Sequence, residues 1–186
     1  SSVKSTHKIT KAMKMVAAAK LRGAEERLRA GRPYAQMLDE VIGNLYRRAE
    51  VTGFPLLEGK ESVQRVEMLV VTSDRGLCGS FNASILRHAW VTRRRLEEEG
   101  KQVNVSIIGR KGADFFKHRQ IELRQKYLNI LGDHNFGLAI RIGDELIESF
   151  NNDVADEVYL VYNEFVSAIS QKIIDRRIIP VSLSTQ

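Results

Sequence analysis

The chain has 186 residues, of which 43% are hydrophobic, enough for one ordinary core plus an extended arm, so two full domains are not required. Its net charge is +6, yet residues 1–32 hold nine Lys and Arg against two Glu, a net charge of +7, so residues 33–186 are close to neutral. Any attraction to nucleic acid or to an acidic surface is therefore confined to the first segment. The single cysteine, Cys78, excludes an internal disulfide, and no apolar run approaches the roughly 20 residues that span a bilayer.

A long helix is predicted over residues 8–49, where strong helix formers such as Ala, Leu, Lys and Glu predominate. At about 1.5 Å per residue this helix would be roughly 60 Å long, more than the diameter of a small domain. Pro33 removes one backbone hydrogen bond and crowds the carbonyl group of Arg29. We therefore expect a bend near residues 31–33.

The first part of this helix carries a narrow stripe of small and apolar residues at alternating steps of three and four, which is the spacing of a coiled-coil seam. The seam consists of Ile9, Ala12, Val16, Ala19 and Gly23. The sequence contains no matching second strand of a coiled coil, so this stripe requires a partner.

Strand and helix patterns alternate beyond a linker predicted at residues 50–65, which is rich in Gly and Pro. Within a central domain at 66–186, we predict strands at 66–71, 103–108, 157–162 and 173–183 and helices at about 80–98, 111–118 and 138–150. The segment before residue 134 is left undefined, and Pro180 places the last strand near an edge. The predicted fold class is α/β: a long N-terminal coiled-coil helix plus a mostly parallel, doubly wound, Rossmann-like sheet that is covered on both faces.

The loop after the first predicted strand, residues 73–79 with the sequence SDRGLCG, lies where phosphate-binding loops of α/β proteins also lie. It lacks the Gly-x-Gly-x-x-Gly spacing of dinucleotide binders and the Gly-Lys-Ser/Thr ending of P-loops, which disfavours a bound nucleotide. Gly76 and Gly79 are interpreted as turn residues with positive φ. Asp74 or Ser80 is expected to cap the following helix.

The residues indicate no catalytic, cofactor or metal site. The four histidines are scattered, without carboxylates or cysteine at metal-ligand spacing. Cys78 is expected to be a small buried or half-buried residue rather than a nucleophile, because no positioned base can be named. Arg75 is expected to be an exposed cation, and Met13 beside Lys11 and Lys14 suits a surface that meets several different neighbours.

Two segments resemble signatures of the gamma subunit of F-type ATP synthases. Residues 9–20, ITKAMKMVAAAK, resemble its N-terminal helix, and residues 73–79 resemble its loop after the first strand, in the family's order. The layout of the chain is also similar, since that subunit has a long N-terminal helix, a central α/β domain and a long C-terminal helix. The resemblance implies an antiparallel coiled coil, in which a C-terminal helix that is missing from this sequence would cover the seam. It favours the bacterial branch and a fragment trimmed at both ends.

The resemblance implies a non-catalytic central-stalk rotor that couples rotation of the c-ring to conformational change in the catalytic alpha/beta hexamer of a proton-translocating ATP synthase. The implied partners are the alpha, beta and epsilon subunits and the c-ring, with no nucleic acid and no insertion into the membrane. The implied location is peripheral, on the cytoplasmic face of the bacterial plasma membrane. Contacts with the beta subunit are assigned by family position to Lys11, Met13, Lys14, Lys20, Arg75 and Cys78.

Two other functions are open from the residues alone. A basic helix on an α/β domain could bind nucleic acid, with an affinity that falls steeply with salt, although no aromatic residue precedes Tyr34. A Rossmann-like enzyme could use the loop at 73–79, and saturable binding of a nucleotide to the isolated chain would favour it.

Overall fold

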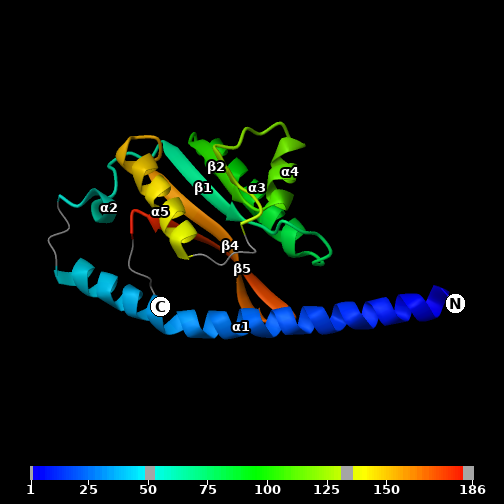
Figure 1. Cartoon of the computed structure of the whole chain (residues 1–186). Helices are drawn as coiled ribbons and strands as arrows, with labels where there is room; N and C mark the ends of the chain where they lie inside the picture. The colour runs from blue at the N-terminus through cyan, green and yellow to red at the C-terminus, as the bar shows by residue number, and fades with distance from the viewer. Residues whose placement is uncertain (1, 49–52, 131–135, 182–186) are drawn as a thin grey trace. The chain divides into compact units, whose positions relative to one another are not determined.

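The computed structural model describes residues 2–48, 53–130 and 136–181, which belong to two compact units (Figure 1). The first unit comprises residues 1–50 and 183–186, and its described part is a single helix, α1 (Ser2–Arg48). The second unit comprises residues 51–182 and contains the sheet and the remaining helices.

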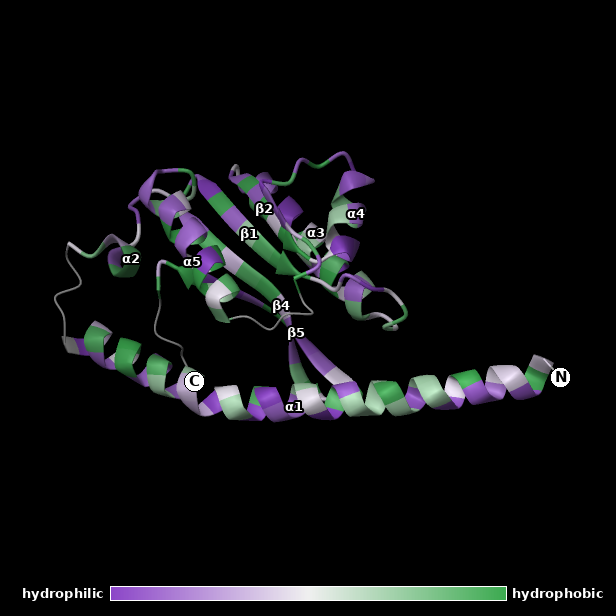
Figure 2. Ribbon diagram, in the orientation of Figure 1, coloured by the Kyte–Doolittle hydropathy of each residue, from purple (hydrophilic) through white to green (hydrophobic). Residues whose placement is uncertain are grey.

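The helix α1 runs without interruption through Pro33 and begins six residues before the predicted start at residue 8. The hydroxyl groups of Thr6 and Thr10 donate hydrogen bonds to the carbonyl oxygens of Ser2 and Thr6, one turn back, at 3.1 and 2.9 Å. Its ribbon bends in the C-terminal half, the half that contains Pro33 (Figure 1). Polar and apolar residues alternate along the visible side of the helix (Figure 2), and most of its described side chains are exposed.

The second unit is built on a five-stranded sheet in the order β3-β2-β1-β4-β5. Its strands are β1 (Arg65–Val71), β2 (Gln102–Ile108), β3 (Gln125–Tyr127), β4 (Glu157–Ser167) and β5 (Ser170–Ile179). The first four strands pair in parallel and β5 pairs antiparallel to β4, which confirms the mostly parallel α/β prediction. The strand β5 lies at the edge and ends directly before Pro180, where a ladder hydrogen bond cannot be donated.

Helices cover both faces of this sheet, as predicted. The helices α3 (Phe81–Glu98) and α4 (Arg110–Lys117) pack on one face and α5 (Phe136–Asn151) packs on the other. Alternate residues of β1 serve the two sides: Met68 and Val70 face α3 and α4, whereas Leu69 faces α5. A short helix, α2 (Pro55–Glu58), lies in the segment that the sequence predicted to be a linker.

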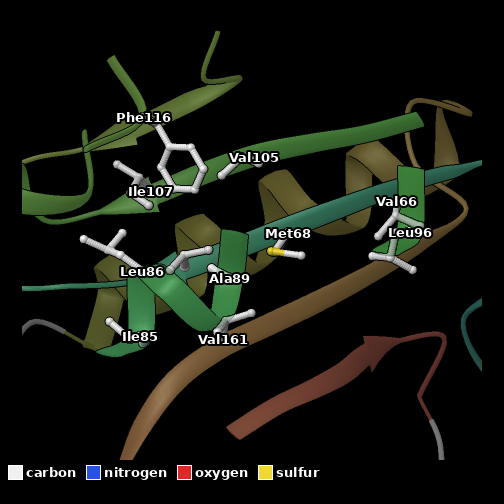
Figure 3. Packing of buried hydrophobic residues seen from close by; sticks show 11 residues of the cluster. Val66, Met68, Ile85, Leu86, Ala89, Leu96, Val105, Ile107, Phe116 and Val161 are labelled. Carbon is white, nitrogen blue, oxygen red and sulfur yellow. The ribbon is translucent and has the colours of Figure 1, made fainter. Parts of the chain in front are cut away.

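The larger of the two core clusters lies between β1, β2 and the helices α3 and α4. Phe116 of α4 packs over Val105 and Ile107 of β2, while Leu86 and Ala89 of α3 approach β1 (Figure 3). All five side chains are at most 4% exposed. This packing fixes the carboxyl ends of β1 and β2, and the loops that follow these two strands carry the residues singled out by the sequence.

Candidate functional site

The predicted partner-binding residues of α1 are exposed but lie on different sides of the helix. At about 100° per residue, Lys11 and Lys14 point to nearly the same side, whereas Lys20 points almost directly away from Lys11. Met13 lies on the same edge as Lys20. A single flat partner cannot meet both groups at once, so these residues form one site only if partners surround the helix.

The seam and most of the positive charge of α1 occupy opposite sides. The seam residues fall within a sector of about 80°, and six of the nine cations before Pro33 lie on the other side of the helix, the exceptions being Lys8, Lys20 and Arg27. Ile9 and Val16 of the seam are 58% and 56% exposed. This arrangement leaves an apolar stripe available to another helix while the cations point away from it.

The residue that follows β1, Thr72, ties this strand to β2 and α4. Its backbone N–H and its hydroxyl both donate to the carbonyl oxygen of Ile108 at 2.8 Å, and the N–H of Gly112 donates to its Oγ1 at 3.0 Å. A Cβ atom at Gly109, where φ is +98°, would lie 2.7 Å from the carbonyl carbon of Thr72. The ends of β1 and β2 can therefore approach each other this closely only with glycine at position 109.

The next segment, residues 73–80, is here called the tip loop, and Asp74 anchors its base. The Asp74 Oδ1 atom accepts hydrogen bonds from the backbone N–H groups of Arg110 and Asn129, both at 3.0 Å. Asp74 thus caps α4, not α3, and Ser80 makes no side-chain capping bond to α3. The expected cap of the following helix was wrong because the parallel sheet brings the end of β2 beside the end of β1.

Asn82, in the first turn of α3, holds the other side of the tip loop. Its Oδ1 accepts the N–H of Ser73 at 3.0 Å, and its Nδ2 donates to the Ser73 Oγ at 2.8 Å and to the Cys78 Sγ at 3.1 Å. The Ser73 hydroxyl donates to the carbonyl oxygen of Arg75 at 2.5 Å. Cys78 is exposed, which corrects the expectation that it is buried or half-buried, because the loop leaves the packed layers beyond Ser73.

The backbone of the tip loop departs from the prediction at one glycine. Gly79 has a positive φ of +59°, as predicted, but Gly76 does not, and Leu77 takes the left-handed conformation instead with φ +61°. Gly76 lies beside the Lys111 side chain: a Cβ atom there would be 3.6 Å from the Lys111 Cε. Leu77 is fully exposed, at 101%, and Arg75 is exposed as predicted.

The tip loop is not arranged as a phosphate cradle. Anions bind at backbone N–H groups that are free at a helix start. Here the N–H of Ser73 is taken by Asn82, and the N–H of Arg110, at the start of α4, is taken by the Asp74 carboxylate. A bound phosphate would have to displace this negative charge, so the geometry argues against a nucleotide site.

No group of three or more metal-ligating side chains gathers in the described part of the chain. The His88 Nε2 lies 2.9 Å from the Asp175 Oδ2, and the His118 Nδ1 lies 2.6 Å from the carbonyl oxygen of Asp114. His134 lies outside the described residues. Among the helices that the structure describes, none has the length and apolar character needed to cross a membrane.

A charged network closes the opposite end of the sheet. The buried Asp156 carboxylate accepts hydrogen bonds from the Arg65 side chain at 2.7 Å and from the N–H groups of Arg65 and Gln64 at 2.7 and 3.0 Å. Burial alone would raise the pKa of Asp156, but these bonds outweigh it and hold that pKa well below its usual range. Lys60 joins the network, with its Nζ 3.3 Å from Asp156 and 4.7 Å from the centre of the Phe150 ring.

Comparisons with known proteins agree on one family. The sequence model of the ATP synthase family matches residues 1–186. ATP synthase gamma chains of Syntrophobacter fumaroxidans and Geobacter metallireducens are 41% and 43% identical to this chain, and each match covers 97% of this chain and 62% of the relative. A chain in the structure of the Tetrahymena thermophila mitochondrial ATP synthase central stalk and c-ring matches 92% of this chain and 72% of its own length, with TM-score 0.69 and 30% identity. The chain thus spans less than two thirds of the length of the curated relatives.

Proposed function

This chain belongs to the ATP synthase gamma-chain family, and we propose that it acts in the central-stalk rotor of a proton-translocating F-type ATP synthase. In this role it catalyses no reaction itself. It couples rotation of the c-ring to conformational change in the catalytic alpha/beta hexamer, and it belongs to a complex that is peripheral on the cytoplasmic face of a bacterial plasma membrane.

The observation that carries this proposal is the division of α1 into an exposed apolar seam and an opposite, strongly basic side. A second helix packed on the seam would complete a slim coiled coil, since the seam residues are small. The same packing would turn most cations outward, toward whatever surrounds the shaft. The different directions of Lys11 and Lys20 fit a shaft that is enclosed by partners.

Exposed cations suit a surface that must attract its partners without being locked to them. Surface ion pairs contribute only about 0–1 kcal/mol each, so they can be exchanged as the shaft turns. Work is transmitted through the asymmetry of the shaft, because a lopsided surface stabilises different conformations in otherwise identical neighbours. We assign contacts with the beta subunit to Lys11, Met13, Lys14, Lys20, Arg75 and Cys78, and further contacts of the protein to alpha, epsilon and the c-ring.

The test is assembly and turnover of a full-length gamma chain that carries this sequence, co-expressed with its alpha and beta subunits. We expect the wild-type chain to co-purify with them, and the double variant Lys14→Glu, Arg75→Glu to lower the ATPase activity of the complex at least severalfold. Arg94→Glu is the matched control, because Arg94 is an exposed cation of α3 whose side chain is 61% accessible.

The control should leave the ATPase activity near the wild-type value. A chain that stays apart from alpha and beta would contradict the rotor proposal. Saturable binding of a nucleotide or of nucleic acid to the isolated chain, in place of assembly, would instead favour an enzyme or a nucleic-acid-binding protein.

A further inference from the structure

Leu77 combines two unfavourable features that no contact of its side chain with the described residues explains. Its side chain is completely exposed, and its backbone adopts a left-handed conformation with φ +61°. That conformation costs a residue other than glycine roughly 1–2 kcal/mol. Gly79 already has a positive φ, but Gly76, directly before Leu77, does not, although glycine adopts that conformation at no steric cost.

The loop around Leu77 is nevertheless held firmly on both sides. Asp74 accepts two backbone hydrogen bonds, from residues that follow β2 and β3. Asn82 bonds both to Ser73 and to Cys78, the residue next to Leu77. The apolar side chain is therefore presented in a fixed position, so little conformational freedom would be lost if a partner covered it.

The surroundings of this side chain are positively charged. Arg75, Arg110 and Lys111 are all exposed, and the Lys111 side chain lies against Gly76. Within the described residues, none of these three cations forms an ion pair, although Arg110 donates a hydrogen bond to the Asn129 Oδ1 at 2.8 Å. The carboxylate of the loop itself, Asp74, is turned inward to backbone N–H groups. The tip loop thus presents one apolar side chain near exposed cations that have no ion-pair partner among the described residues.

We propose that Leu77 is an apolar anchor that inserts into a recess of the catalytic ring, and that this recess is rimmed by carboxylates which meet Arg75, Arg110 and Lys111. The inference rests on the proposed function and adds to it a residue that charge alone does not indicate. Burial of Leu77 supplies affinity, whereas the cations orient the loop and speed its approach.

The test measures binding of a full-length gamma chain carrying this sequence to its purified alpha and beta subunits, with wild type, Leu77→Gly, Leu77→Met and Val91→Ala. Leu77→Gly removes the anchor and also relieves the positive φ, so the free chain should be at least as stable as wild type. We expect its dissociation constant to rise about tenfold or more, mainly through faster dissociation. Leu77→Met keeps the apolar volume and should stay within about threefold of wild type.

Val91→Ala is the matched control, because Val91 is an exposed apolar residue of α3, 60% accessible, outside the tip loop. Lys111→Gln should slow association and reduce its dependence on salt. If wild type binds tightly while Leu77→Gly weakens binding no more than Val91→Ala, or Leu77→Met weakens it as much as Leu77→Gly, the anchor is overturned and the rotor proposal stands. If wild type does not bind alpha and beta at all, both are overturned.

Discussion

The helix α1 and the α/β unit maintain their structures in opposite ways. Most described side chains of α1 are exposed, including the apolar Ile9 and Val16, whereas β1 is buried over nearly its whole length. The sequence of an isolated helix contributes little to its stability when its apolar stripe is exposed to solvent, because most helical stability in proteins comes from packing. The α/β unit has a buried core of its own on both faces of its sheet, and the tip loop is built on it, while the apolar stripe of α1 stays exposed.

The largest expected effect tests how tightly the ends of β1 and β2 are joined. Gly109→Ala would push a methyl group against the Thr72 backbone at a residue with positive φ, and we expect a loss of about 3 kcal/mol or more in the free energy of unfolding. Gly100→Ala is the control, because Gly100 has φ +84° but no atom within 4 Å of the added group. It should cost only about 1–2 kcal/mol, and equal losses in urea unfolding would contradict a steric role for Gly109.

A smaller effect is expected from the charged network at the other end of the sheet. Asp156→Asn removes the closer and more buried of the two carboxylates that pair with Arg65, at 2.7 Å against 3.7 Å for Asp153, and should cost about 2–3 kcal/mol at pH 7. Because folding lowers the pKa of Asp156, its contribution is present above about pH 4 and is lost as the pH falls below that.

Urea midpoints between pH 7 and pH 2 check this prediction. The wild type should converge on Asp156→Asn as the pH falls, and a constant difference across this range would refute the linkage. Asp153→Asn is the control, since Asp153 shares the Lys60 contact but its side chain is 71% exposed, and it should lose much less stability.

A local effect is expected at the base of the tip loop. Asp74→Ala leaves the N–H groups of Arg110 and Asn129 without their acceptor and should cost about 1 kcal/mol. Amide hydrogen exchange should accelerate at these two positions, while Ser80→Ala, which removes no capping bond, should leave exchange unchanged. Uniform acceleration across α3 and α4 would mean that Asp74 supports the whole fold and not the loop alone.

The smallest effect is expected on α1. Val16→Ala removes exposed apolar surface from the seam, so the unfolding free energy of the α/β unit should change by no more than about 0.5 kcal/mol. Leu86→Ala, in the core under α3, should cost about 2–5 kcal/mol in the same measurement. A large loss from Val16→Ala would show that the seam is already covered in the isolated chain.

The main elements could be predicted from sequence because their apolar periodicity is strong. The apolar run in β1 and the amphipathic patterns of α3 and α5 outweigh the secondary-structure propensities of single residues. The edge position of β5 follows from Pro180. The strand β3 was missed because it has three residues, two of them exposed, and no apolar run. The strand β4 continues to Ser167 because it pairs with β5, and the exposed Glu164 hides that continuation in the sequence.

The tip loop was predicted by position and motif, but not in its details. Asp74 caps α4 instead of α3, since its choice depends on the neighbouring strand and not on the next residues along the chain. Leu77 could not have been found by propensity, because leucine rarely adopts a positive φ. Contacts between distant segments decide both outcomes.

Because the seam and most cations of α1 lie on different sides, the direction in which each cation points depends on its spacing from the seam residues along the chain. Each residue advances the helix by about 100°, so one residue inserted between Val16 and Ala19 would rotate all later cations by that angle relative to the earlier ones. Arg22 and Arg29 would then leave the side occupied by Lys11 and Lys14. In this helix an insertion would therefore change the distribution of positive charge around the helix, although it replaces no charged residue.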